Sequence, residues 1–172
     1  MTSAERRRKL RKRSAAKRPP KPLIFYVDEC LGTHVPAALI AAGLDVRPWY
    51  DHFPGVPDVE WLPPIGARRW VLLTKDREIR RRPIEVQAIL NARVRAFVLV
   101  ATALRREEQA TLILGAMKKI HRICKRPGPF IYNITTMGAL SEVPYRILSR
   151  RAHRRPPSNA SERGAILAAA RS

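Results

Sequence analysis

Short apolar runs of β-prone residues alternate with stretches of helical periodicity along the middle of the chain, and this alternation constrains the fold most. The predicted strands cover residues 23–27, 45–49, 70–73, 96–100 and 130–134. The predicted helices cover residues 35–42, 83–93 and about 105–124, where apolar residues recur three and four positions apart. Alternating strands and helices are typical of a parallel sheet with right-handed crossovers. We therefore expect an α/β domain with a mostly parallel sheet of about 4–5 strands flanked by helices.

Basic residues are concentrated near the two ends of the chain. Lysine and arginine number 34 against 14 acidic residues, a formal net charge of +20, yet residues 23–145 hold 17 basic and 12 acidic side chains. The like-charged run over residues 1–22 predicts a basic disordered arm, and the Arg- and Pro-rich residues 149–172 predict a basic C-terminal tail. Residues 23–148 are then expected to form a single domain. This excess of positive charge favours a nucleic acid partner, although tails that only aid solubility would have the same composition.

The cysteines and the hydropathy pattern indicate the cellular compartment of the protein. Cys30 and Cys124 have no metal-ligand spacing, so we expect free thiols in a reducing compartment. No apolar run approaches the roughly 20 residues that a membrane span needs. The basic start of the chain also lacks the apolar stretch of a secretory signal. We therefore expect a cytoplasmic protein without a membrane partner.

Carboxylates follow two of the predicted strands at the points where these strands end. Asp28 comes directly after residues 23–27, and Asp76 lies three residues after the run 70–73. Asp58 stands at the start of a helical stretch that precedes the second of these strands. Functional groups in open α/β sheets gather beyond the carboxyl ends of the strands. We therefore predict that Asp28 and Asp76 meet at one edge of the sheet, a position that is compatible with Asp58 as a third acid.

Carboxylates that gather at one point raise each other's pKa, and a divalent cation relieves their repulsion. Oxygen ligands of this kind favour Mg²⁺ or Mn²⁺ as the cofactor. One or two such metals, held by Asp28, Asp58 and Asp76, would lower the pKa of a bound water and direct it at a phosphodiester. The side chains predicted to support the site are Glu29, Glu60, Thr74 and Glu78. The side chains predicted to bind the substrate are Lys75, Arg77, Arg80, Arg81 and Arg82.

Most of these residues also have an ordinary structural explanation. Asp58 stands where a helix N-cap residue would, and aspartate is common in turns. Glu29 and Glu78 fit a solvated surface as well as they fit a supporting role. Residues 80–82 fit either a substrate-binding patch or a solvated face. Asp28 and Asp76 are the stronger candidates, because both follow apolar strands.

Three runs of sequence carry a family resemblance: FYVDECL at residues 25–31, DVEWL at residues 58–62 and VLLTKDREIR at residues 71–80. Their order resembles the PIN-like domain family of bacterial toxin–antitoxin ribonucleases, and the likeness covers about residues 23–140. The resemblance implies a Rossmann-like PIN fold, RNA cleavage that depends on Mg²⁺ or Mn²⁺, and pairing with an antitoxin protein; it is also compatible with a homodimer. It places the metal-binding acids at Asp28 and Asp76. For the middle acid it favours Asp58, with Glu60 as the competitor.

The resulting hypothesis is a metal-dependent endoribonuclease that acts as the toxin of a toxin–antitoxin pair. A non-catalytic nucleic-acid-binding module on a nuclease-like fold is the main alternative, because most of the net positive charge lies outside the predicted domain. A third reading is a protein whose basic surface pairs with an acidic protein partner. The RNA target, and the choice between RNA and single-stranded DNA, stay open.

Overall fold

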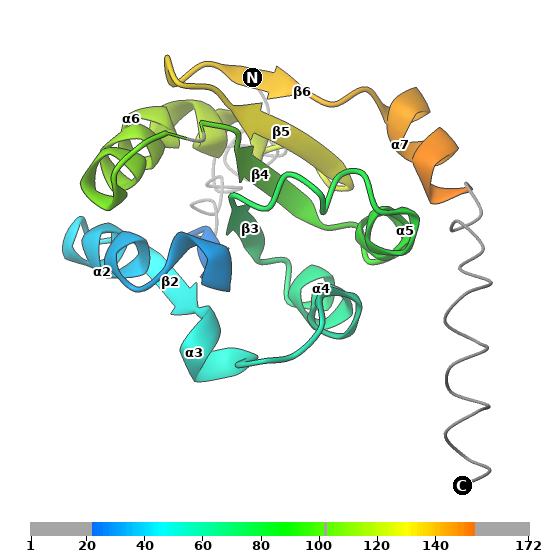
Figure 1. The fold of residues 1–172 in the computed structure, drawn as a ribbon, viewed down its shortest axis with the longest axis horizontal. Coiled ribbons are helices and arrows are strands. Elements are labelled where there is room, and N and C mark those ends of the chain that lie inside the picture. Colours follow the sequence, from blue (N-terminus) through cyan, green and yellow to red (C-terminus); the bar gives the residue numbers. More distant parts are fainter. Residues whose placement is uncertain (1–21, 102, 154–172) are drawn as a thin grey trace, which may run out of the picture.

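The computed structural model describes residues 22–101 and 103–153, which form one sheet with helices on both faces (Figure 1). The strands are β1 (Ile24–Val27), β2 (Asp45–Pro48), β3 (Val71–Thr74), β4 (Arg95–Leu99), β5 (Phe130–Ile134) and β6 (Leu140–Glu142). The helices are the 3-10 turn η1 (Glu29–Leu31), α2 (His34–Ala41), α3 (Trp49–His52), α4 (Asp58–Ala67), α5 (Pro83–Asn91), α6 (Arg106–Ile123) and α7 (Tyr145–Ala152). The predicted arm before residue 22 and the predicted tail beyond residue 153 lie outside the described residues.

The sheet has five parallel strands and an antiparallel strand at one edge. The strand order is β2-β1-β3-β4-β5-β6, and only β6 runs against its neighbour. After β1 the chain forms β2 on one side and then crosses to the other side of β1 to form β3. The strand order therefore reverses between β1 and β3. Ligands of open α/β sheets bind beyond the carboxyl ends of the strands at such a point.

Each face of the sheet contributes to a separate hydrophobic core, because successive strand residues point to opposite faces. Phe25 and Val27 of β1 face the core that α2 and α6 cover. Tyr26 faces the other core, where Trp61 of α4 and Val86 of α5 are buried. Helices α4 and α5 pack on each other over this second face, and α7 packs on α5 (Figure 1). Their packing decides where the first residues of α4 and α5 lie.

The predicted α/β architecture is confirmed, and each of the five predicted strands agrees with the structure to within one residue at either end. The sixth strand, β6, was not predicted, because a three-residue strand has no readable alternation. Helix α7 was not predicted either, because its arginine-rich sequence looks like a tail. It folds because Leu148 is buried against the second core. The predicted domain boundary at residue 148 falls inside α7.

The structure also corrects the predicted cap of α4. Pro57 is the N-cap residue, and Asp58 is the first residue of the helix, so its side chain does not serve as the cap. No helix among the described residues is long and apolar enough to cross a membrane.

Candidate metal centre

The carboxyl ends of β1 and β3 bring Asp28 and Asp76 to the same edge of the sheet. Val27 and Leu73 are partners in the parallel ladder, and the amide of Asp28 donates to the carbonyl of Leu73 (3.0 Å). Asp28 therefore stands beside Thr74, two residues before Asp76. Both acids lie at the carboxyl edge of the sheet, as predicted from the sequence, and the structure adds that the strand order reverses there.

A buried network of hydrogen bonds fixes Asp28. Its Oδ2 accepts a hydrogen bond from the Thr74 hydroxyl (2.6 Å) and one from the Cys30 thiol (3.0 Å). The Thr74 hydroxyl oxygen in turn accepts the amide N–H of Asp76 (2.9 Å). Asp28 is 9% exposed and Thr74 is fully buried. Thr74 thus ties the end of β1 to the loop that carries Asp76, which gives it a positioning role.

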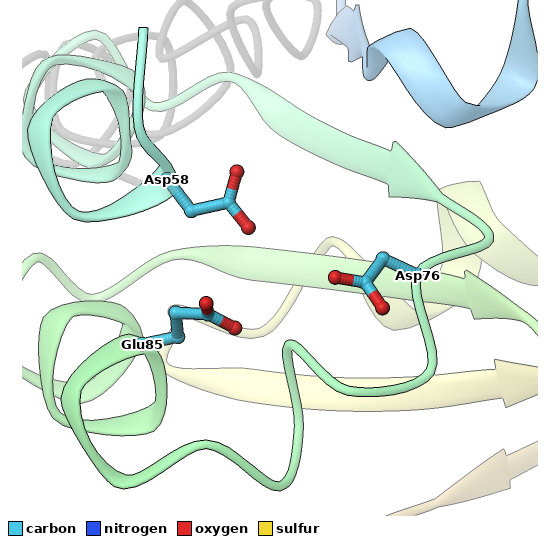
Figure 2. A group of neighbouring side chains, drawn as sticks. All are labelled: Asp58, Asp76 and Glu85. Carbon is cyan, nitrogen blue, oxygen red and sulfur yellow. The ribbon is translucent and has the colours of Figure 1, made fainter. Parts of the chain in front are cut away.

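Three carboxylates from separate elements converge beside this network, and we call them the acidic cluster: Asp58, Asp76 and Glu85. One oxygen from each lies within 4.8 Å of the other two. Asp58 begins α4, Glu85 lies in the first turn of α5, and Asp76 lies in the loop after β3. Figure 2 shows the three carboxylates pointing toward one another from these elements.

The electrostatics of the acidic cluster reflect this crowding. Burial raises the pKa of Asp58 from its ordinary 3.8 to about 6. The charges of Asp28, Glu85 and Asp76, in that order, act in the same direction. Asp28 is therefore close enough to influence the acidic cluster although it is not one of its three members. The N-termini of α4 and α5 carry partial positive charge, which favours the ionised forms of Asp58 and Glu85.

Glu85 brings a buried carboxylate oxygen without a hydrogen-bond partner among the described residues to the acidic cluster. This oxygen is Oε2, and Glu85 is 9% exposed. Burial raises the pKa of Glu85, and the hydrogen bond from Arg82 opposes this effect. An anionic oxygen that is buried without a donor costs free energy unless a cation neutralises it.

These donors suit a hard divalent cation. They offer three carboxylates, one of which presents a buried oxygen without a partner in the part of the chain that the structure describes. Positive charge would relieve their mutual repulsion. Asp58, Asp76 and Glu85 would hold such an ion. Asp28 would add negative charge beside it.

The other predicted residues surround the site at different depths. Glu29 and Glu60 are exposed and are not members of the acidic cluster, so Asp58 rather than Glu60 contributes the carboxylate from α4. The Glu78 carboxylate forms an ion pair with Arg81 (3.0 Å). The backbone amide of Glu78 donates a hydrogen bond to Asp76 Oδ1 (2.8 Å).

The predicted substrate-binding residues lie in the segment between β3 and α5. Lys75, Arg77, Arg81 and Arg82 are exposed. Arg80 is partly buried, and burial followed by the charges of neighbouring arginines lowers its pKa. Arg82 pairs with two acids of the cluster, Glu85 (2.9 Å) and Asp76 (3.3 Å). The segment therefore presents several positively charged side chains beside the acidic cluster.

Glu85 is the member of the acidic cluster that the sequence prediction missed. Its signal in the sequence is weak, because an acidic residue in the first turn of a helix is ordinary. Pro83 marks the first turn of α5, and Glu85 two residues later is placed at the same edge as Asp58.

Comparison with known proteins agrees with this geometry. Residues 23–101 match the family model described as a PIN like domain, which includes β1, β3 and all three members of the acidic cluster. Residues 23–101 are thus similar to a PIN-like domain. The family resemblance predicted from the sequence is thereby confirmed.

The PIN-like domain also has a relative among curated proteins. The protein named "Putative ribonuclease VapC45" of Mycobacterium tuberculosis (strain ATCC 25618 / H37Rv) is 29% identical over 116 residues, which are 64% of this chain and 84% of the relative. No solved structure matches the chain.

Proposed function

We propose that this chain is a metal-dependent endoribonuclease that uses Mg²⁺ or Mn²⁺. The observation that carries the proposal is the acidic cluster, in which one oxygen from each of three carboxylates lies within 4.8 Å of the others. The cluster lies in the PIN-like region, at the switch point, which is the edge of the sheet where the strand order reverses between β1 and β3. A relative whose name describes it as a ribonuclease supports RNA as the substrate. The net charge of +20 supports a polyanionic substrate, whether RNA or single-stranded DNA.

The chain's own residues have distinct roles in this proposal. Asp58, Asp76 and Glu85 hold the cation, and Asp28 adds its charge from a position that Thr74 fixes. A divalent cation bound there would polarise the scissile phosphate and lower the pKa of a water molecule. The mutual repulsion of the carboxylates in the absence of a cation favours cation uptake.

The basic segment between β3 and α5 would position the RNA. Lys75, Arg77 and Arg81 are exposed within a few residues of Asp76, where they would contact phosphates on either side of the scissile bond. Arg80 is more buried and would act through the electrostatic field rather than by direct contact. These contacts orient the substrate and carry no base specificity.

We also propose that the protein is the toxin of a toxin–antitoxin pair and acts in the cytoplasm. The family resemblance supports an antitoxin partner, and the strongly basic chain suits an acidic protein surface. Homodimer formation stays a prediction from the same resemblance.

The test is an RNA cleavage assay with purified protein in Mn²⁺ and in EDTA. We expect cleavage in Mn²⁺ but not in EDTA. The cleavage rate should fall by at least about a hundredfold in Asp76→Asn and in Asp58→Asn. Glu107→Gln is the matched control, because Glu107 is an exposed acid in the first turn of α6, outside the acidic cluster. It should leave the rate unchanged. Circular dichroism spectra would show that all variants are folded.

The same assay discriminates the alternative function. Cleavage that persists in EDTA, or that is equal in wild type and Asp76→Asn, would contradict the proposal. Salt-dependent RNA binding without cleavage in any protein, with a panel of structured and single-stranded RNAs, would favour the non-catalytic binding module.

A further inference from the structure

The guanidinium of Arg82 contacts two of the three carboxylates of the acidic cluster. A single nitrogen of its guanidinium, Nη1, donates to Glu85 Oε1 (2.9 Å) and to Asp76 Oδ2 (3.3 Å). One positive group therefore joins two of the three carboxylates that would hold a cation. Arg82 is also the N-cap residue of α5, so it is held three residues from Glu85 on the same element.

This neutralisation by Arg82 is incomplete. Glu85 Oε2 has no partner among the described residues although the atom is buried. Asp58, the third member, gains only long-range attraction from Arg82. The arginine thus satisfies part of a site whose remaining oxygens still lack a positive partner.

The side chain of Arg82 can leave the acidic cluster at low cost. It is 54% exposed, whereas the side chains of its two partners are 25% and 11% exposed. Because more than half of the arginine side chain already contacts solvent, the guanidinium itself loses little when it turns outward and a cation takes its place beside the acids. The acids are held by the fold, and the arginine is the member of the group that is free to turn into solvent.

We propose that Arg82 takes the place of the cation in the metal-free protein, and that it exchanges this position for an RNA phosphate when cation and substrate bind. This rests on the proposed function. The cation and the guanidinium compete for oxygens of Asp76 and Glu85, so the cation must displace Arg82. The displaced guanidinium gains a phosphate as its new partner, since its planar donors match phosphate oxygens.

The exchange makes cation binding and phosphate binding favour each other. A cation that binds alone loses the attraction between Arg82 and the acids, whereas a cation that binds with RNA recovers it as an arginine–phosphate pair. Linkage requires the effect to be reciprocal, so RNA must also bind more tightly when the cation is present. Arg82 would thereby limit metal loading in the absence of substrate.

The test measures Mn²⁺ binding by titration calorimetry, first alone and then with an uncleavable 2′-O-methyl oligoribonucleotide. The variants are Arg82→Gln and Arg82→Lys. Arg126→Gln is the matched control, because Arg126 is an equally exposed arginine whose ion-pair partner, Glu142, lies outside the acidic cluster. Asp76→Asn reports Mn²⁺ that is attracted only nonspecifically.

We expect Arg82→Gln to bind Mn²⁺ alone on the order of tenfold more tightly than wild type, because a positive charge a few ångströms away is removed. In wild type the oligoribonucleotide should tighten Mn²⁺ binding, and this gain should disappear in Arg82→Gln. Arg82→Lys should bind Mn²⁺ alone about as weakly as wild type, since one nitrogen makes both contacts with the acids. Its gain with the oligoribonucleotide should be smaller than that of wild type, because an ammonium lacks the planar donors that match a phosphate. Arg126→Gln should bind Mn²⁺ like wild type, both alone and with the oligoribonucleotide.

The outcomes separate this inference from the proposed function. If wild type binds no more Mn²⁺ than Asp76→Asn, the proposed metal site is wrong and the exchange falls with it. If wild type binds Mn²⁺ specifically but Arg82→Gln binds it no more tightly, the exchange is overturned and the metal site stands. An oligoribonucleotide gain that survives in Arg82→Gln would likewise overturn the exchange.

Discussion

Gly66 is the point of closest approach between α4 and α5, and replacing it with alanine should loosen both the core and the site. A Cβ at this position would stand 2.0 Å from the carbonyl oxygen of Ala92 and 2.8 Å from its carbonyl carbon. Ordinary contact begins at 3.4 Å, so the backbones would have to separate by 3.4 − 2.0, or about 1.4 Å. No side-chain rotation relieves this clash, because the opposing atoms belong to the backbone.

The magnitude follows from two opposing effects. Overpacking that shifts backbone costs about 1–3 kcal/mol, and a clash with a carbonyl oxygen belongs at the upper end of that range. Alanine recovers about 1 kcal/mol through its better helix propensity. We therefore expect Gly66→Ala to lower the free energy of unfolding by about 2 kcal/mol.

The assay is equilibrium unfolding in urea, with Gly115→Ala as the matched control. Gly115 also lies within a helix, α6, but a Cβ there would meet nothing within 4 Å. Gly115→Ala should raise the free energy of unfolding by up to about 1 kcal/mol. Because α4 and α5 carry Asp58 and Glu85, Gly66→Ala should also weaken Mn²⁺ binding. A Gly66→Ala variant as stable as wild type would refute the reasoning.

Two further predictions concern the groups around the acidic cluster. Thr74→Val should lower the free energy of unfolding by about 1–3 kcal/mol, because Asp28 Oδ2 and the Asp76 amide each lose a buried partner; Thr74→Ser should restore most of it in urea unfolding. In EDTA, the free energy of unfolding should fall as the pH rises from about 4 to about 6, because the raised pKa of Asp58 makes the folded state hold a proton that the unfolded state has released. The two pKa units correspond to about 3 kcal/mol, which solvent screening at this half-buried residue reduces to about 1 kcal/mol. Asp58→Asn should reduce this slope, and the remainder should come from Glu85, whose pKa burial also raises. A slope unchanged in Asp58→Asn would contradict the assignment.

The sheet was predictable because its central strands are buried on both sides. All four residues of β3 are buried, so the strand reads as a continuous apolar run between Arg69 and Lys75. The edge of the sheet was less predictable, since β6 makes its hydrogen bonds with only three residues and exposes two of them. Helix α7 depends on tertiary packing of Ile147 and Leu148 against the second core, which the local sequence does not reveal.

Some residues of the candidate site could be predicted from local sequence, whereas others depend on tertiary packing. Asp28 and Asp76 follow strands, and a rule that depends only on strand ends places both of them at the switch point. The acids on helices needed a different argument. In a parallel α/β sheet each connecting helix returns the chain to the start of the next strand, so it begins near the carboxyl edge. Any acid in a first helical turn is therefore a candidate at that edge.

This wider rule selects too many residues until the faces of the sheet are known. It would admit Glu107 and Glu108 at the start of α6 together with Asp58 and Glu85. The structure separates them, because α6 packs into the core on one face while α4 and α5 share the other. Among these helix acids, only those on α4 and α5 meet in the acidic cluster, and the absence of a side chain at Gly66 allows the two helices to approach closely. The third carboxylate of the acidic cluster is thus a consequence of helix packing, and for that reason the spacing of acids along the chain does not reveal Glu85.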